Sequence, residues 1–231
     1  HMLEDPPLLV IRKSFQRPPA AKLTKLEAAQ TGHIVDAMNG RGALDPAIKP
    51  VDPNRAQFIG TAMTCETGPS DNLAIMAAIA LAQAGDVIVS ASDGFMSTAV
   101  VGDIVTLMAK NAGIQAIVLD GMARDSQGIL GVGLPVFSRG ITPNSCVRSG
   151  PGRVGHPIVA GGVAIEPGDV IVGDRDGVVV VPLRLLDEVI DRVEAIREAE
   201  KGVIANVSDN RLTHLDSIAA LLKSDRVRYV D

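Results

Sequence analysis

Residues 102–125 read GDIVTLMAKNAGIQAIVLDGMARD and combine the pattern of a helix with that of a strand. The spacing of apolar residues predicts a helix over Ile104–Asn111, ended by a glycine, and then a buried strand over Ile114–Leu119. About nine helical residues at roughly 1.5 Å each descend about 14 Å, and about six strand residues at roughly 3.3 Å each climb back about 20 Å. We therefore expect Asp103, at the helix start, to lie at the same sheet edge as Arg124 and Asp125, beyond the strand end.

Helices and strands alternate before this segment, and short strands dominate after it. Upstream, we expect a helix beginning at Leu23, a strand over Phe58–Cys65, a helix over Leu73–Ala84 and a strand over Val87–Ser90. The short downstream strands are predicted at Val136–Ser138, Ile158–Ala160, Val163–Ile165, Val170–Val172 and Val178–Val181. Two amphipathic helices, Leu183–Lys201 and Leu212–Lys223, close the chain. The pattern predicts an α/β fold with mixed layers around one core, not a strict doubly wound sheet.

Composition excludes several classes of protein. Of the 231 residues, 46 % are apolar and 21 % are charged, and the mean hydropathy is +0.24, which excludes intrinsic disorder. Leu73–Ala84, one of the longest apolar stretches, is far too short to cross a bilayer. With 2 % aromatic residues and a net charge of −5, the chain lacks the stacking platforms and basic face of a nucleic-acid binder. Because of this charge, the low aromatic content and the short apolar stretches, we expect no nucleic-acid or membrane partner. Cys65 and Cys146 cannot form a disulfide framework, so we expect a cytoplasmic protein.

Several common chemical motifs do not occur in the sequence. There is no H-E-x-x-H pair, cysteine cluster or EF-hand loop, and the glycine-rich run 150–155 lacks the lysine and hydroxyl residue of a phosphate-binding loop. His33, His156 and His214 are scattered along the chain, which favours structural roles. Cys146 has no basic partner nearby in the sequence, so the pattern does not favour a nucleophilic role.

Asp103, Arg124 and Asp125 are the residues that favour a chemical site. Two carboxylates suit Mg²⁺ or Mn²⁺, which prefer oxygen ligands and retain several waters. The free amides of Gly102–Val105 and the helix dipole would hold a substrate carboxylate, while Arg124 offers a planar fork to that group or to an adjacent carbonyl oxygen. This set predicts a 2-oxo acid site that stabilises a developing enolate. The alternative interpretation is structural, with an N-capping Asp103 and an Arg-Asp turn at the surface.

The spacing of these residues resembles the motif of a known family. Asp103, twenty intervening residues, then Arg124 and Asp125 match the D-x20-R-D pattern of the RraA-like family. That family includes the 4-hydroxy-4-methyl-2-oxoglutarate/4-carboxy-4-hydroxy-2-oxoadipate aldolases and RraA, the regulator of ribonuclease E activity. Further stretches that resemble the family are Asp36–Gly42, Asp71–Leu73, Ala84–Val87, Arg139-Gly140 and Gly173–Val178.

The resemblance implies a fold, an assembly and a domain organisation. The expected fold is a three-layer β/β/α sandwich like the swivelling phosphohistidine domain, with C-terminal helices, assembled as homotrimers or hexamers. Independently of the resemblance, the prolines within residues 1–20 predict an N-terminal arm over residues 1–22, which opens with His1-Met2, the pattern of a cleaved tag. Residues 23–201 would form the RraA-like catalytic domain, and residues 202–231 a C-terminal helical extension.

The resemblance also implies a role for each site residue. Asp125 would bind the divalent metal directly, and Asp103 would act through a metal-bound water. The groups that would bind the pyruvyl part of the substrate are Arg124 and the backbone of Gly102, Asp103, Ile104 and Val105. In the aldolases an acidic residue from a neighbouring subunit's C-terminal helix completes the site, and the candidates here are Glu194, Glu198 and Glu200.

The function that the resemblance implies is that of a divalent-metal-dependent class II pyruvate aldolase. Such an enzyme would cleave 4-hydroxy-2-oxo acids of the 4-hydroxy-4-methyl-2-oxoglutarate type to pyruvate. It would also decarboxylate oxaloacetate, because both reactions break a C3–C4 bond and leave a metal-bound pyruvate enolate. One alternative is an RraA-type inhibitor that binds ribonuclease E, and another is a sugar-acid or dicarboxylate enzyme with the same enolate chemistry. Gly128 departs from the aldolases, which often carry Asp or Glu there, and this departure concerns both the substrate preference and the aldolase reaction itself.

Overall fold

The computed structural model describes residues 7–231, which form two compact units. The larger unit, called the body below, ends at Val193, and the C-terminal unit runs from Glu194 to Asp231. The predicted tag remnant, His1-Met2, lies outside the described residues. None of the helices within residues 7–231 is long and apolar enough to cross a membrane.

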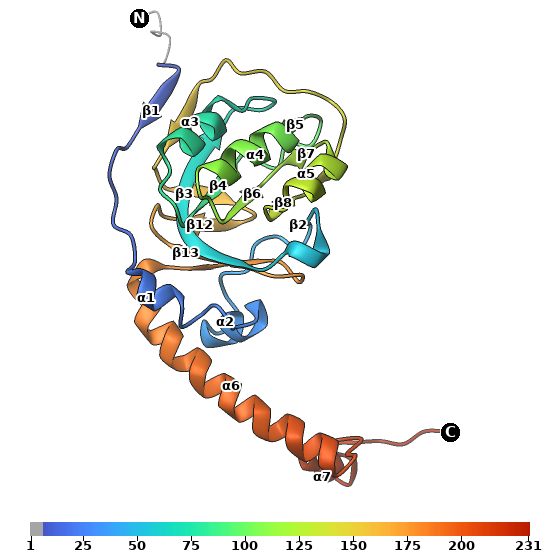
Figure 1. Cartoon of the computed structure of the whole chain (residues 1–231). Coiled ribbons are helices and arrows are strands. Elements are labelled where there is room, and N and C mark those ends of the chain that lie inside the picture. The colour runs from blue at the N-terminus through green and yellow to red at the C-terminus, as the bar shows by residue number, and fades with distance from the viewer. Residues whose placement is uncertain (1–6) are drawn as a thin grey trace, which may run out of the picture. The chain divides into compact units, whose positions relative to one another are not determined.

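Nine strands of the described body form one sheet (Figure 1). Its centre consists of parallel neighbours, in the order β3 (Phe58–Thr67), β4 (Asp86–Ala91), β6 (Ala116–Leu119) and β8 (Val136–Ser138). Beyond β3 lie β10 (Gly152–Val154) and β1 (Leu9–Ile11), and beyond β8 lies β2 (Lys49–Pro50), which the short 3₁₀ helix η1 (Pro53–Arg55) connects to β3. β13 (Val170–Gly173) pairs antiparallel with the first residues of β3 and with β14 (Val178–Val181). The fully buried strands β4 and β6, both predicted from sequence, therefore lie in the centre of the sheet.

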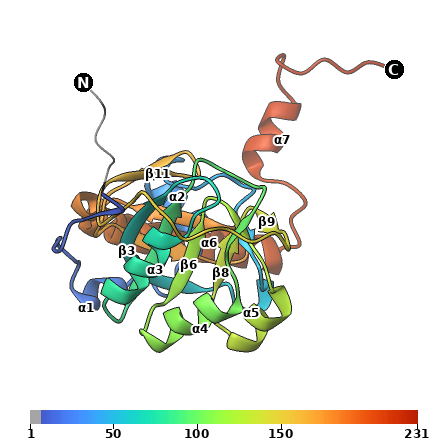
Figure 2. The same cartoon turned by 90° about the horizontal axis from the view of Figure 1, so that it is seen from above.

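The two faces of the sheet are covered by different layers. α3 (Leu73–Leu81), α4 (Asp103–Asn111) and α5 (Ser126–Val132) lie on one side (Figure 1 and Figure 2), where Ile75 and Val105 share an apolar cluster with Ile117 of the sheet. On the other side a second cluster joins the sheet to the antiparallel hairpin of β11 (Ile158–Ala160) and β12 (Val163–Ile165). The body is therefore an α/β sandwich, which confirms the fold class that the resemblance implies.

A small parallel sheet aligns the starts of two helices. It consists of β5 (Ala99–Val101), β7 (Met122–Ala123) and β9 (Gly140–Ile141). β5 leads into α4, and β7 leads into α5. Because β5 and β7 pair side by side in the same direction, the two helix starts are brought next to each other at one end of the body.

The prediction of a helix that begins at Leu23 is wrong. The chain instead forms α1 (Ala20–Leu23), a series of turns, and α2 (Thr31–Ala37). Leu26, in the turns, is nevertheless fully buried. α2 starts at Thr31 because the amide and hydroxyl of this residue both donate to the Asp174 carboxylate, at 2.8 and 2.9 Å. Apolar spacing cannot reveal this break, since the partner lies 143 residues away in the chain.

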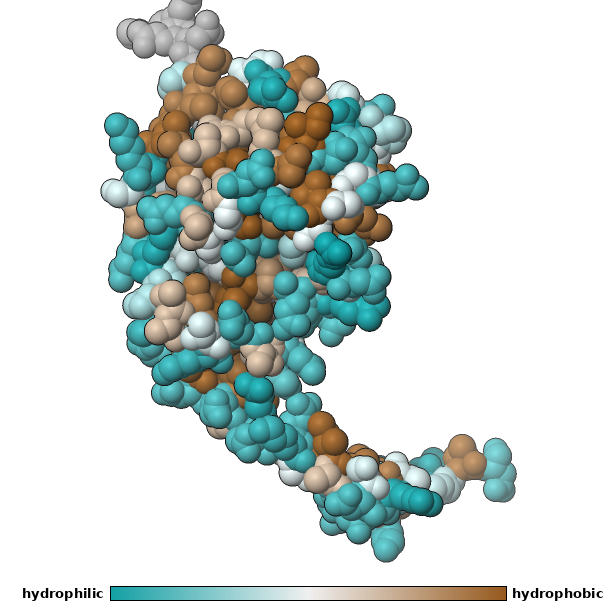
Figure 3. Space-filling model, in the orientation of Figure 1, coloured by the Kyte–Doolittle hydropathy of each residue, from teal (hydrophilic) through white to brown (hydrophobic). Residues whose placement is uncertain are grey.

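The C-terminal unit is helical. α6 (Leu186–Asp209) follows the 3₁₀ helix η2 (Leu183–Leu185) and continues into this unit, where α7 (Asp216–Leu222) comes next. The first predicted C-terminal helix therefore starts and ends later than expected, and the second is shorter than expected. Large apolar side chains of this unit remain exposed, among them Ile204 at 59 % and Ile218 at 44 %. Figure 3 shows apolar patches (brown) among the polar residues of this unit.

Candidate functional site

The first wall of the candidate site is the start of α4. Gly102 precedes the helix, and its carbonyl accepts hydrogen bonds from the amide and the hydroxyl of Thr106, at 3.0 and 2.8 Å. Asp103 Oδ1 accepts a hydrogen bond from the amide of Ile104, at 2.7 Å. The amides of Asp103 and Val105 belong to the first turn and have no acceptor within the helix. The helix start thus presents a carboxylate together with unused donors.

The second wall is the junction between β7 and α5. The amide of Arg124 donates to the carbonyl of Val101 at 3.0 Å, which joins this junction to the residue just before Gly102. Asp125 caps α5 with a φ of 55° in the left-handed region. A non-glycine residue in that region costs of order 1–3 kcal/mol, and such residues cluster at functional sites. The Asp125 carboxylate also lies 3.2 Å from Nε of Arg124.

Glycines allow the two walls to come into contact. A Cβ atom on Gly102 would lie 2.5 Å from Oδ2 of Asp125, and a Cβ atom on Gly128 would lie 2.4 Å from Oδ2 of Asp103. Each carboxylate therefore occupies space that a side chain on the opposite wall would fill. The structure brings Asp103 together with Arg124 and Asp125, although twenty residues separate Asp103 from Arg124 in the sequence.

The donor chemistry of this arrangement fits a divalent cation. Asp103 and Asp125 offer hard oxygen ligands, and the Asp125 side chain is 44 % exposed, so that an ion could reach it. Within residues 7–231, no group of three or more His, Cys, Asp or Glu side chains could hold a metal ion. One or two carboxylates are the usual protein ligands of Mg²⁺, which retains much of its water. Both carboxylates are thus suited to an ion held by few protein ligands.

A cavity of about 290 Å³ lies between the two walls and is also lined by residues that no sequence pattern indicates. Ser145 accepts a hydrogen bond from Nη1 of Arg124 at 2.5 Å. Arg148 donates through Nε to Oδ1 of Asn72 at 3.1 Å, and the buried Asn72 amide donates in turn to the carbonyl of Val100 at 3.0 Å. The cavity therefore contains two guanidinium groups, and each is held by a neutral polar side chain.

The segment that carries the missed residues runs alongside distant parts of the chain. Isolated parallel bridges join Ser145 to Ala99 and Val147 to Asp71. The buried Asp71 carboxylate accepts hydrogen bonds from the amides of Ser149 and Gly150, at 2.6 and 2.9 Å. This segment has neither helical nor strand periodicity, so the sequence signal for it was limited to the family-like stretch around Asp71.

Cysteine and histidine residues add little to the chemistry of this cavity. Burial raises the pKa of the half-buried Cys146 thiol, and the charges of Arg148 and Arg124 oppose this shift without reversing it. A thiol of raised pKa is a poor nucleophile at neutral pH. None of His33, His156 and His214 lines the cavity.

The acidic residues expected from a neighbouring subunit lie on α6 within the C-terminal unit. They are Glu194, Glu198 and Glu200. Lys201 donates a hydrogen bond to Glu198 and lowers the pKa of that carboxyl group. Their role toward a second chain remains a prediction.

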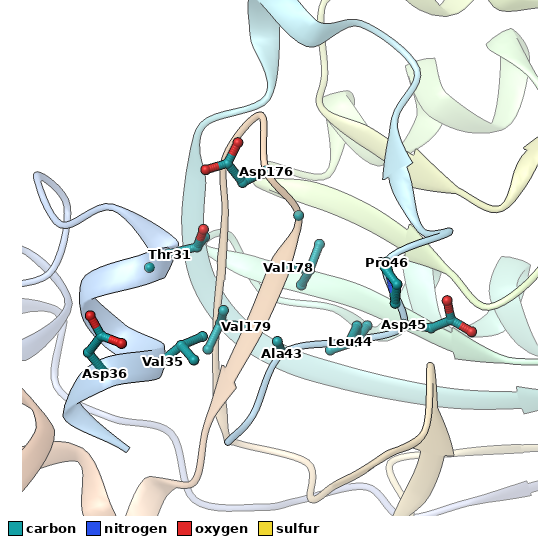
Figure 4. Close-up of a pocket in the computed structure, with 12 residues that line it drawn as sticks. Thr31, Val35, Asp36, Ala43, Leu44, Asp45, Pro46, Asp176, Val178 and Val179 are labelled. Carbon is teal, nitrogen blue, oxygen red and sulfur yellow. The ribbon is translucent and has the colours of Figure 1, made fainter. Parts of the chain in front are cut away.

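A further cavity of about 310 Å³ is also lined by carboxylates, but these do not lie close together as Asp103 and Asp125 do. Figure 4 shows that the carboxylates of Asp36, Asp45 and Asp176 come from three separate segments and point in different directions. Asp45 forms an ion pair with Arg139 at 2.8 Å. The hydrogen bond from the amide of Ala47 lowers the pKa of Asp45, and the Arg139 guanidinium lowers it further. These residues therefore do not form a second candidate metal site.

Comparison with known proteins identifies the family. Residues 31–180, well over half of the chain, match the RraA-like family described as Aldolase/RraA. The match extends from the start of α2 almost to the end of β14 and contains Asp103, Arg124 and Asp125. The chain belongs to the RraA-like family. The membership confirms the resemblance that the D-x20-R-D spacing indicates.

Other RraA-like proteins carry different names. A relative from Halalkalibacterium halodurans, provisionally named 4-hydroxy-4-methyl-2-oxoglutarate aldolase, is 37 % identical over 188 residues, which cover 81 % of this chain and 89 % of the relative. The crystal structure of an uncharacterized protein from Pseudomonas syringae is 32 % identical, with a TM-score of 0.74 over 84 % of this chain and 96 % of that one. The RNA-processing inhibitor RraA from Thermus thermophilis is 27 % identical, with a TM-score of 0.61 over 67 % of this chain and 93 % of that one.

Proposed function

We propose that this RraA-like protein is a divalent-metal-dependent lyase that releases pyruvate from 2-oxo acids. It would act as a class II aldolase on 4-hydroxy-2-oxo acids and as an oxaloacetate decarboxylase. The observation that carries the proposal is the meeting of Asp103, Arg124 and Asp125 at one cavity beside a helix start. Two carboxylates and a guanidinium suit a metal-assisted site for a 2-oxo carboxylate. The aldolase name of a relative that is 37 % identical supports the same reaction class.

Each site residue has a separate task in this proposal. Asp125 would hold the divalent cation directly and Asp103 would hold it through water; the bound cation would supply Lewis-acid stabilisation of the negative charge that develops on the substrate. Arg124 would bind the carboxylate and 2-oxo oxygens with its planar fork. Ser145 keeps this fork in place through its hydrogen bond. The free amides of Asp103 and Val105 would donate to the substrate carboxylate.

One arrangement of residues can serve both reactions. In the aldol substrate the C3–C4 bond breaks, its electron pair moves toward the 2-oxo group, and the 4-hydroxyl proton passes to a base. In oxaloacetate the same bond breaks with loss of carbon dioxide. In both cases C3 must regain a proton to give pyruvate, and a water beside Asp103 is the proposed donor. Arg124 neutralises the charge that grows on the 2-oxo oxygen in either reaction.

We also propose that the protein assembles as a trimer or a dimer of trimers, with the site near a subunit boundary. The exposed apolar side chains of the C-terminal unit support this assembly. On α4, next to the cavity, Ile104, Leu107 and Met108 are 67 %, 47 % and 44 % exposed. A second chain that covered these side chains could bring Glu194, Glu198 or Glu200 to the site.

The second candidate function is inhibition of ribonuclease E through protein binding. The structural similarity to the Thermus RNA-processing inhibitor favours it, because the same fold serves that role. The paired carboxylates favour catalysis instead, since a protein that only binds another has no need of a metal site. An experiment must therefore decide between the two functions.

The deciding experiment measures pyruvate release from oxaloacetate and from a panel of 4-hydroxy-2-oxo acids, with Mg²⁺ and with EDTA. Inhibition of ribonuclease E by the same preparation is measured in parallel. We expect pyruvate formation above the background of the metal alone, its loss in EDTA, and its return with Mg²⁺ or Mn²⁺. Inhibition of the ribonuclease without any pyruvate release would instead support the second candidate function.

A further inference from the structure

The motif Asp36–Gly42, read DAMNGRG, has no part in the proposed reaction. Its Arg41 lines a separate cavity of about 430 Å³ in the body, together with Arg184 and Arg192. The only acidic side chain on the wall of this cavity, within the described residues, is Glu188. Three guanidinium groups therefore face one carboxylate, in a chain whose net charge is −5. Such a local excess of positive charge, against the balance of the whole chain, indicates an anionic ligand.

Two of these guanidinium groups are free to bind a ligand. None of the side-chain hydrogen bonds or ion pairs found in residues 7–231 involves Arg41 or Arg184. Arg192 is different, because it donates to Oδ1 of Asn39 at 2.7 Å and lies 3.4 Å from Glu188. Arg192 thus connects α6 to the motif, while the guanidinium N–H groups of Arg41 and Arg184 remain available to a ligand. The charge of Arg184 also acts on the buried Asp169, whose oxygens are occupied by two backbone amides.

The backbone around Arg41 is fixed before any ligand binds. Asn39, Gly40 and Gly42 all have positive φ, at 57°, 80° and 89°. A Cβ atom on Gly42 would lie 2.6 Å from Cε of Met38 and 2.7 Å from the carbonyl oxygen of Val180, so only glycine fits there. The Gly42 carbonyl accepts a hydrogen bond from the amide of Val180 at 2.9 Å. Arg41 is therefore displayed from a tightly held turn, which lowers the conformational cost of binding.

The rest of the cavity wall is largely apolar, with contributions from Met38, Val163, Val180, Leu185 and Val189. Its volume lies within the range of small-molecule sites, which begins at about 300 Å³. Guanidinium forks match carboxylate and phosphate oxygens equally well. We propose that this cavity, named the Arg41 site, binds a small organic anion that carries carboxylate or phosphate groups on a hydrocarbon body. It shares no lining residue with the cavity of Asp103 and Asp125.

Calorimetric titration of the full-length protein tests the Arg41 site directly. Citrate probes the carboxylate form of the ligand and phenyl phosphate the phosphate form, both at low ionic strength in EDTA, so that no metal takes part. We expect saturable binding of at least one probe at one site per chain. Because charge-assisted hydrogen bonds are lost, Arg41→Gln and Arg184→Gln should each weaken that binding by about tenfold or more.

Two matched variants control for charge elsewhere on the protein. Arg153→Gln removes an exposed guanidinium on β10 that pairs with Glu66, and Arg124→Gln removes one from the other cavity. In both variants the affinity for the probe should stay within about twofold of the wild-type value, because neither residue lines the Arg41 site. Three results would overturn the proposal: no saturable binding of either probe up to about 5 mM, wild-type affinity in Arg41→Gln and Arg184→Gln, or loss of binding in Arg124→Gln alone. Thermal unfolding of each variant verifies that it is folded.

Discussion

The body and the C-terminal unit carry similar apolar patterns, yet only the body buries them. Within α6, Val189 and Val193 are each 2 % exposed in the body, whereas Val203 and Ile204, farther along the same helix, are 51 % and 59 % exposed. An apolar stripe therefore predicts a helix in both places but does not predict what covers it. The comparison agrees with the proposed division of roles, in which the body would provide the site and the C-terminal unit would provide a surface for another chain.

The largest expected effect concerns the core of the body. Phe137 is fully buried and contacts Phe58 edge to face, with ring centroids 5.4 Å apart. We expect Phe137→Ala to lower the free energy of unfolding by about 3–5 kcal/mol, because it leaves a cavity. Its counterpart in the C-terminal unit is Tyr229→Ala, where the side chain is 73 % exposed and the change should stay within about 0.5 kcal/mol. Chemical denaturation measures both, and similar losses in the two variants would contradict the comparison.

The next largest effect concerns the site. Arg124→Lys keeps a positive charge but loses the fork that can contact carboxylate and 2-oxo oxygens together. We expect the barrier to rise by about 2–4 kcal/mol, which is about 10²–10³ in rate, with kcat falling as well as kcat/KM. Arg211→Lys in the C-terminal unit is the matched control and should act as wild type. Steady-state kinetics on oxaloacetate with kcat/KM of Arg124→Lys within about threefold of wild type would remove Arg124 from the mechanism.

A third prediction concerns the surface of the C-terminal unit. If this surface meets a second chain, Leu222, which is 45 % exposed, becomes buried in the assembly. We expect Leu222→Ser to weaken association by about 1.5–3 kcal/mol and to leave the unfolding of the body unchanged. Light scattering should give a multiple of 24.1 kDa for the wild type, consistent with three or six chains, and a smaller mass for the variant on dilution. A wild-type mass of one chain at micromolar concentration would refute the assembly.

The smallest expected effect concerns two helical glycines, whose replacement by alanine should change the stability in opposite directions. In α5 a Cβ atom on Gly128 would lie 2.4 Å from Oδ2 and 2.6 Å from Cβ of Asp103, whereas nothing lies within 4 Å of one on Gly202 in α6. Alanine normally stabilises a helix by up to about 1 kcal/mol relative to glycine, so Gly202→Ala should stabilise. Gly128→Ala should instead cost about 1 kcal/mol or more, because Asp103 must move. Thermal unfolding distinguishes the two, and stabilisation by Gly128→Ala would show that Asp103 is free to move.

The sequence predicted the parts of the site that depend on local pattern. The helix expected over Ile104–Asn111 is α4, which begins one residue earlier, and the strand ending at Leu119 is β6 with the same end. The expectation that Asp103 would lie beside Arg124 and Asp125 also holds, because a helix and its following strand return the chain to one edge. The residue roles that the resemblance implies stay predictions.

The parts that the sequence did not reveal depend on distant pairing. Asn72, Ser145 and Arg148 reach the cavity through bridges between segments with no periodic pattern. Likewise α2 begins where Asp174 holds Thr31, and a single sequence gives no sign of that contact. Local pattern therefore predicted which elements form, while long-range hydrogen bonds determined where irregular segments lie.

The central claim is that Asp125 binds a divalent metal on which catalysis depends. Calorimetric titration of Mn²⁺ into wild type, Asp125→Ala and Asp103→Ala, with oxaloacetate decarboxylation measured on the same samples, tests it most directly. We expect Asp125→Ala to lose Mn²⁺ binding and activity together and Asp103→Ala to lose less of both. Asp209→Ala, in the C-terminal unit, should behave as wild type. Unchanged Mn²⁺ affinity in Asp125→Ala, or full wild-type activity in EDTA, would contradict the central claim.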